Sequence, residues 1–255
     1  MSGDAFAGLA RFYDPIMSHV DYARWERIAR RLAEQVPAPA PAPLAHLDVA
    51  CGTGVLLSRL RAAGWDSVGV DLSRAMLRNG KRPRTACADM RALPFAERFD
   101  LVTCLFDSVN FVVEEEGVQA ACNEFARVLR PGGMLYFDVV TERMVLKHFT
   151  GPEWSEDHGE FRSTWHTHYD KKQRIAQTHV RIGTGASSII VERMHPLPVL
   201  DACLARAGLQ LLARFDAEDH RPATGKSCRV DFIAVKPPHT LPDRWVRALP
   251  KLLLA

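Results

Sequence analysis

The sequence has few of the features that mark membrane, secreted or metal-binding proteins. Its 255 residues contain no uninterrupted apolar run of about 18 residues, the length that a membrane-spanning helix needs. No N-terminal stretch is first charged and then apolar, as a signal peptide is. The six cysteines include no CxxC pair, which disfavours a zinc knuckle and a disulfide scaffold. We therefore expect a cytoplasmic protein with no membrane partner and with reduced cysteines in its core.

Charge and composition exclude further classes. The formal net charge of +3 is too small to indicate a nucleic-acid partner. With 47% hydrophobic and 25% charged residues, the chain has an ordinary globular composition, so disorder is not indicated. Its length suits one large α/β domain, or one domain with an insertion.

What the sequence does contain is a glycine loop between a predicted strand and a predicted helix. The apolar run 44–50 is typical of a buried strand, and Gly52 and Gly54 turn it sharply into a helical pattern at 55–62. Glycine permits such a turn and lets a ligand approach the backbone closely, because no Cβ stands in the way. The loop therefore predicts a binding site for a cofactor.

A carboxylate at the end of the next predicted strand indicates which kind of cofactor. The strand 66–70 ends at Asp71, nineteen residues after Gly52. A carboxylate there can accept hydrogen bonds from both hydroxyls of a ribose, although an aspartate before a helix can also cap that helix. A dinucleotide fingerprint needs a third glycine or small residue, but Val55 and Leu57 stand at the two candidate positions. NAD is therefore disfavoured.

The segment 48–54 resembles the acidic-x-Gly-x-Gly-x-Gly loop of class I S-adenosylmethionine-dependent methyltransferases, with Ala50 in place of the first glycine. Three later segments resemble further motifs of that family: 88–95 its third strand, 99–111 its fourth, and 127–133 the helix end before its fifth. The resemblance covers about 44–140 and the closing elements at 198–235. It implies S-adenosyl-L-methionine as the cofactor.

The resemblance also implies roles for individual residues. Asp89 would bind the adenine amino group beside Met90, although Asp89 can also organise a turn. Asp48 would reach the amino group of the cofactor, fix the loop, or do both. The cofactor-binding set implied in this way is Tyr13, Tyr22, Trp25, Asp48, Ala50, Cys51, Gly52, Thr53, Gly54, Asp71, Leu72, Met76, Asp89, Met90, Leu105, Phe106 and Asn110.

The alternation of strands and helices predicts a Rossmann-like, doubly wound α/β fold with a mostly parallel sheet. The family pattern implies seven strands, the last one antiparallel. The predicted strands are 44–50, 66–71, 84–88, 99–105, 133–140, 209–215 and 229–235. The predicted helices are 54–63, 73–80, 114–129 and 198–207, and the Pro-Gly-Gly at 131–133 is expected to stop the third of these.

Two regions depart from the alternation. Residues 1–43 comprise one or two helices within 6–36 and a stiff Pro-Ala spacer at 37–43. Residues 145–195 contain three runs with turn chemistry between them, 161–169, 174–182 and 188–195, which predicts an inserted antiparallel β-layer. We expect it to cover the substrate pocket or to form the surface of a homodimer. The core would comprise 44–144 and 196–236, followed by a tail at 237–255.

Two residues are candidates for catalysis. Methyl transfer from a sulfonium mainly requires an aligned nucleophile, exclusion of water and removal of one proton. Asp107 can hold an amine acceptor or receive its proton. A hydroxyl acceptor needs a stronger base, for which His195 is a candidate, although a lone histidine is more often structural.

The segment 106–111 and the N-terminal aromatic residues resemble the small-molecule methyltransferases that include nucleotide-sugar amine and glycine-type N-methyltransferases. In such enzymes the N-terminal helices cover the cofactor, so Tyr13, Tyr22 and Trp25 are candidate lid residues, although aromatic residues at helical spacing also pack into cores. His166, His168 and His179 of the insertion could approach a metal, but no carboxylate or cysteine pattern supports one, and we expect no metal.

The function predicted from these features is methyl transfer from S-adenosylmethionine to a small molecule, at an amine or a hydroxyl. One alternative is a nucleic-acid methyltransferase, but 106–109 lacks the Asn/Asp-Pro-Pro-Tyr/Phe clamp used on base amines. The other is a protein that binds S-adenosylmethionine or S-adenosylhomocysteine without catalysis. The residues do not identify the acceptor.

Overall fold

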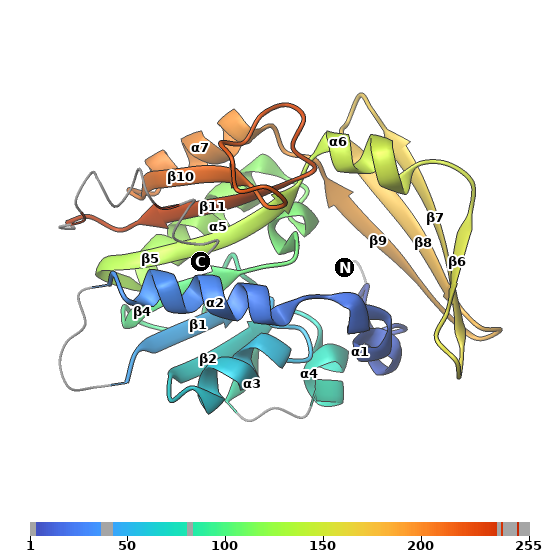
Figure 1. Ribbon diagram of the computed structural model, residues 1–255, viewed down its shortest axis with the longest axis horizontal. Helices are drawn as coiled ribbons and strands as arrows, with labels where there is room; N and C mark the ends of the chain where they lie inside the picture. Colours follow the sequence, from blue (N-terminus) through green and yellow to red (C-terminus); the bar gives the residue numbers. More distant parts are fainter. Residues whose placement is uncertain (1–3, 37–42, 81–83, 239–240, 242–248, 250–255) are drawn as a thin grey trace.

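Strands and helices alternate along most of the chain in the computed structural model, which describes residues 4–36, 43–80, 84–238, 241 and 249. Seven strands form one sheet in the order β10-β11-β5-β4-β1-β2-β3 (Figure 1). They are β1 (Ala45–Val49), β2 (Asp66–Asp71), β3 (Thr85–Cys87), β4 (Phe99–Cys104), β5 (Leu129–Val140), β10 (Gln210–Asp216) and β11 (Arg229–Val235). β1 to β5 pair in parallel, whereas β11 is antiparallel to both neighbours. The predicted fold class is confirmed.

Helices cover both faces of this sheet. α2 (Tyr22–Ala33) and α3 (Val55–Ala62) pack on one face, and α5 (Glu115–Val128) and α7 (Leu197–Arg206) pack on the other. α4 (Arg74–Gly80) lies against β2 and β3. The buried side chains of α2 recur at helical spacing, at Trp25, Ile28, Ala29 and Leu32. An Asp21 carboxylate oxygen caps this helix by accepting a hydrogen bond from Arg24 N.

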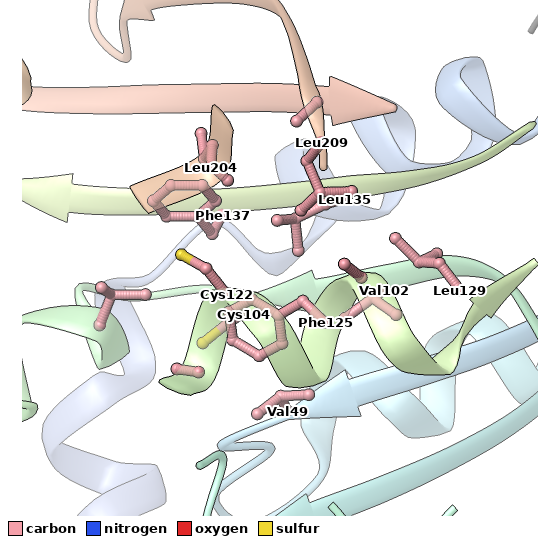
Figure 2. Close-up of a cluster of buried hydrophobic side chains, with 14 of the residues drawn as sticks. Val49, Val102, Cys104, Cys122, Phe125, Leu129, Leu135, Phe137, Leu204 and Leu209 are labelled. Atoms are coloured by element: carbon pink, nitrogen blue, oxygen red, sulfur yellow. The ribbon is translucent and has the colours of Figure 1, made fainter. Parts of the chain in front are cut away.

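The larger core lies between the sheet and the α5–α7 layer. Figure 2 shows side chains of β1, β4 and β5 meeting those of α5, with α7 above them. Phe125 is 1% exposed and Leu204 is fully buried, while Phe137 stacks on Phe232 with 4.7 Å between ring centroids. Central strands covered on both faces need continuous apolar runs, which explains why the strand pattern was readable from the sequence.

The insertion forms a second sheet, order β6-β7-β8-β9, which stands apart from the first in Figure 1. Its strands are β6 (Trp154–Asp157), β7 (Arg162–Asp170), β8 (Ile175–Ile182) and β9 (Ala186–Arg193). The antiparallel layer is as predicted, except that β6 was not anticipated. The turn of helix α6 (Glu142–Met144) and the π-helix at Val145–Phe149 precede it. His166, His168 and His179 are exposed.

Three expectations need adjustment. The Pro-Gly-Gly at 131–133 does not stop a helix, because α5 ends at Val128 and these residues lie inside β5, where Gly132 has φ +81°. All six cysteines are free, as expected, but Cys87 is exposed and is not a core residue. The N-terminal region folds as η1 (Ala10–Phe12), α1 (Tyr13–Ile16) and η2 (Met17–His19) before α2. Most of the expected Pro-Ala spacer, at 37–42, lies outside the described residues.

Candidate active site

The carboxyl ends of β1, β2 and β4 open into a cavity of about 1370 Å³. In open α/β sheets this edge is where ligands bind. Residues of the N-terminal helices and of the inserted sheet also line this cavity. Most of the residues singled out by sequence line this one cavity: Tyr13, Tyr22, Trp25, Asp48, Ala50, Cys51, Gly52, Thr53, Asp71, Leu72, Met76, Asp89, Met90, Leu105, Phe106 and Asp107.

The glycine loop has three left-handed residues within five positions: Ala50 at φ +55°, Gly52 at φ +57° and Gly54 at φ +78°. Glycine adopts this conformation without strain, whereas alanine does so at a cost of about 1–3 kcal/mol. The end of α4 supports the loop from below, because a Cβ on Gly80 would overlap the backbone of Thr53. The loop is thus held in one shape by its surroundings.

Asp71 joins the loop to the end of β2. Its Oδ2 accepts a hydrogen bond from Gly52 N at 2.8 Å, and its Oδ1 accepts one from Ser73 N at 2.7 Å. Burial raises the pKa of Asp71, and the two backbone hydrogen bonds oppose that rise. Each oxygen keeps a second lone pair, and the side chain lines the cavity, so the ribose and capping roles are compatible.

Asp48 is the most deeply buried carboxyl of the glycine loop, at 4% exposure. Its Oδ1 accepts a hydrogen bond from Thr103 Oγ1 at 2.7 Å, and the same hydroxyl lies 2.9 Å from His46 Nε2. Burial raises the pKa of Asp48 to about 7 and lowers the pKa of His46 to about 3. The imidazole is therefore neutral and cannot compensate Asp48. A cationic ligand group in the cavity would fit such a carboxyl.

Asp89 has a partner that sequence reasoning missed. Its carboxylate forms an ion pair with Arg91, with Nη2 and Oδ2 2.6 Å apart, and its Oδ1 accepts a hydrogen bond from Arg91 N at 2.9 Å. The Arg91 hydrogen bond lowers the pKa of Asp89. These local contacts fit the turn role, and the side chain also lines the cavity, as the adenine role requires.

The N-terminal aromatic residues form one wall of the cavity. Trp25 meets Phe106 edge to face, with 5.6 Å between ring centroids, and Tyr22 meets Trp25 at the same distance. Thr53 Oγ1 donates a hydrogen bond to Asp14 Oδ1 at 2.5 Å, which ties this segment to the glycine loop. Burial raises the pKa of Tyr22 to about 12, so its hydroxyl is a proton donor at neutral pH. Packing and covering are both served by this arrangement.

Beyond β4 the backbone makes a strained turn in which Phe106 and Asp107 have φ +59° and +52°. Asp138, at the end of β5, holds this turn by accepting hydrogen bonds from Phe106 N at 2.6 Å and Asp107 N at 3.2 Å. Arg229 of β11 forms ion pairs with Asp138 and with Asp107, the latter at 2.8 Å. The Asp107 carboxylate is thereby fixed at the cavity wall.

A second carboxyl reaches the same wall from the inserted sheet. Glu192 of β9 is 5% exposed and lines the cavity. Burial and the nearby Asp107 raise the pKa of Glu192 well above its usual range. Sequence reasoning missed Glu192, Asp138 and Arg229. Only Glu192 carried a local signal, an acidic residue directly after the apolar run 189–191.

Three predicted site residues do not line the cavity. His195 is buried, and its Nε2 lies 2.8 Å from Val112 O, which engages the ring in holding a loop. Asn110 is fully buried, and its Nδ2 donates to Val140 O and Arg193 O at 3.0 and 2.8 Å. Gly54 begins α3. These positions support the site from behind it.

No group of three or more His, Cys, Asp or Glu side chains among the described residues is placed to hold a metal ion. Among the described helices, none combines the length and apolarity that crossing a membrane would take.

The fold is one that S-adenosylmethionine-dependent methyltransferases of known structure share. Residues 47–133 match the family described as "Methyltransferase domain". The solved structure of a S-adenosylmethionine-dependent methyltransferase from Clostridium acetobutylicum ATCC 824 superimposes with a TM-score of 0.77 at 22% identity, over 90% of this chain and 98% of that one. That likeness is one of fold.

Sequence relatives include enzymes with different acceptors. The chain is 31% identical over 142 residues to the dTDP-4-amino-2,3,4,6-tetradeoxy-D-glucose N,N-dimethyltransferase of Saccharopolyspora spinosa. The matched segment covers 51% of this chain and 57% of that protein. The chain is 37% identical over 138 residues to the demethylmenaquinone methyltransferase of Renibacterium salmoninarum, covering 51% and 54%. A Bacillus subtilis relative matches over 65% of its length. The chain thus spans less than two thirds of each of these relatives.

Proposed function

We propose that this protein transfers the methyl group of S-adenosylmethionine to an amine of a small molecule. The observation that carries the proposal is the convergence of three carboxylates, Asp48, Asp71 and Asp107, on one cavity at the carboxyl edge of the parallel strands. S-adenosylmethionine supplies an activated methyl group on a cationic sulfur. The residues of the chain have to bind it, orient the acceptor and exclude water.

The residues present fit this cofactor. Asp71 would hold the ribose, Asp89 and Met90 would border the adenine, and Asp48 would bind the cationic amino group. The support for the last role is physical: the Asp48 carboxyl is buried, its histidine neighbour is neutral, and a positive group would offset the cost of its ionisation. Tyr13, Tyr22 and Trp25 would close the cavity above the cofactor.

The acceptor side favours an amine over a hydroxyl. Asp107 presents a carboxylate to the cavity, where it can orient an amine and receive the one proton that the nitrogen loses. A hydroxyl acceptor needs a stronger base, and the candidate for it, His195, is outside the cavity and bonded to Val112 O. The sugar-amine relative supports the same choice.

The deciding experiment combines cofactor binding with a screen of acceptors. Calorimetry should show binding of S-adenosylhomocysteine, and labelled S-adenosylmethionine should deliver its methyl group to members of an amine panel. Binding without turnover of any amine, alcohol or carbon acceptor would indicate a non-catalytic binder. Turnover restricted to alcohols or quinols would contradict the amine assignment while leaving the methyltransferase assignment in place.

The Asp71→Asn variant tests the cofactor side directly. It removes the charge but keeps one oxygen for the loop amides, so the fold should persist. We expect cofactor affinity to fall by about 1–3 kcal/mol, the range for a hydrogen bond to a charged group. Asp66→Asn, at the opposite end of β2, is the matched control and should leave affinity unchanged. Equal calorimetric affinities of the Asp71 variant and the unmodified protein would refute the ribose role.

A further inference from the structure

The carboxyl group of Glu192 is unusual for its place in the protein. Its side chain lies on β9 beside the cavity and is 5% exposed. No described residue provides a backbone or side-chain donor with hydrogen-bond geometry to its Oε1. Buried polar atoms are normally hydrogen-bonded, because an unsatisfied one costs about 1–3 kcal/mol. An atom in this state beside a large cavity is suited to a ligand.

Asp107, in the turn after β4, also has a buried carboxyl oxygen without a hydrogen-bond donor among the described residues. It is 8% exposed, and its Oδ1 contacts Arg229 Nη2 at 2.8 Å without the geometry of a hydrogen bond. Burial first, and then the charge of Asp107 and a side-chain hydrogen bond to it, raise the pKa of Glu192. The raised pKa favours a protonated Glu192, whose proton is shared with Asp107 through that hydrogen bond.

The charged groups around Asp107 and Glu192 carry an excess of negative charge that one cation would offset. Asp107, Asp138 and Glu192 bring three acidic groups, and Arg229 is the guanidinium that offsets them in this cluster of described residues. Arg229 is engaged by Asp138 and Asp107 and lies over the Phe106 ring, 5.1 Å from its centroid. With one shared proton, the cluster keeps a net charge of one negative unit.

We propose that Asp107 and Glu192 together bind the ammonium group of the acceptor, so that Glu192 of the inserted sheet determines the preference for amines. An ammonium group offers three N–H donors and can replace the shared proton between two carboxylates, whereas an alcohol offers one donor and no charge. This inference rests on the methyl transfer proposed above, and it names the group that the acceptor side recognises.

The protons balance through the reaction. Binding of the ammonium group displaces the shared proton to solvent and leaves two carboxylates around one cation. Before attack, the nitrogen gives one proton back to the pair, which restores the shared proton and frees the nitrogen lone pair. The nitrogen then bonds to the methyl carbon, and the electron pair of the breaking carbon–sulfur bond remains on sulfur.

The test uses cyclohexylammonium as the probe and cyclohexanol as its uncharged counterpart, each titrated calorimetrically into the full chain with and without S-adenosylhomocysteine. Titrations in phosphate and in HEPES count the protons released, because the two buffers differ in ionisation enthalpy. We expect the amine to bind about tenfold more tightly than the alcohol and to release close to one proton. In Glu192→Gln, amine affinity should fall about tenfold and proton release should vanish.

Glu153→Gln is the matched control, because Glu153 pairs with Arg181 of the inserted sheet and is not among the cavity-lining residues. It should bind both probes as the unmodified protein does. Glu192→Gln is isosteric with a protonated Glu192, so we expect it to fold, which its S-adenosylhomocysteine affinity would check. If the amine is not preferred, or if Glu192→Gln retains amine affinity and proton release, the inference is wrong. Failure to bind S-adenosylhomocysteine would instead count against the proposed function.

Discussion

The two sides of the cavity are built in different ways. On the cofactor side, Asp48, Gly52 and Asp71 come from one strand–helix–strand unit, and the carboxylates of Asp48 and Asp71 are satisfied by backbone amides and a hydroxyl. On the acceptor side, Asp107 lies in the turn after β4 and Glu192 lies on the inserted sheet, and both interact with the single guanidinium of Arg229 in that cluster. The first side is local in sequence, and the second exists only in the folded chain.

This difference bears on what each side can tolerate. The cofactor side depends on the conformation of the glycine loop, so a substitution that shifts the backbone of this loop should weaken cofactor binding. A cluster of buried charges depends on mutual compensation, and removing one member leaves another uncompensated. We therefore expect the largest loss of stability on the acceptor side and smaller effects on the cofactor side.

Asp138→Ala should have the largest effect. It removes the acceptor for two backbone amides of the strained turn at 106–107 and the principal partner of Arg229. Breaking a buried ion pair from one side costs about 3–5 kcal/mol. Urea unfolding should show this loss. Asp66→Ala is the control, since its pairs with Arg84 and Arg98 are partly exposed and worth about 1 kcal/mol or less. Equal losses in both variants would erase the distinction between the two sides.

Gly80→Ala should be next, on the cofactor side. A Cβ at this position would overlap the backbone of Thr53, so the loop or α4 must shift, at about 1–3 kcal/mol for overpacking. Because Thr53 belongs to the cavity wall, cofactor affinity should fall together with stability. Gly185→Ala is the control, because nothing lies within 4 Å of its added Cβ. Full stability with unchanged affinity would show that the loop adapts freely.

Asp48→Asn sharpens the electrostatic part of the comparison. The pKa of Asp48 is raised by burial from 3.8 to about 7, so folding favours its protonated form. Its contribution is fully present below about pH 4 and is lost as pH rises to about 7. Relative to the unmodified protein, the Asn variant should therefore gain about 4 kcal/mol between pH 4 and pH 8. Denaturant midpoints at the two pH values measure this difference, and a constant offset would contradict the buried state of Asp48.

The elements that could be predicted from the sequence are those with a local pattern. The apolar run and terminal carboxylate of β2 identified Asp66–Asp71 in full, and β11 was predicted with its observed bounds. β6 was missed because Trp154–Asp157 is short and largely exposed, so it has no apolar alternation. The end of α5 was placed too late, because pairing with β4 extends β5 back to Leu129.

The same reasoning explains which site residues could be found. The glycine loop and the strand ends position their side chains through local backbone geometry, so Asp48, Asp71 and Asp107 were predictable as cavity residues. Arg229 reaches the cavity only through the pairing of β11 with the distant β5, and Glu192 reaches it only because the inserted sheet folds against that side of the cavity. His195 and Asn110 lie outside the cavity lining, because proximity along the chain does not determine which side of a turn a side chain occupies.

The smallest expected effect concerns the N-terminal wall, where covering and packing roles give different results. Tyr22→Phe keeps the ring against Trp25 and removes only the hydroxyl, so stability should be unchanged. If that hydroxyl faces the bound cofactor, affinity should fall by about 0.5–1.5 kcal/mol. Tyr169→Phe is the control, since its hydroxyl donates to Glu142 in the inserted region and it is not among the cavity-lining residues. Unchanged cofactor affinity in Tyr22→Phe would show that the Tyr22 hydroxyl does not contribute to cofactor binding. The N-terminal wall would then act through packing alone.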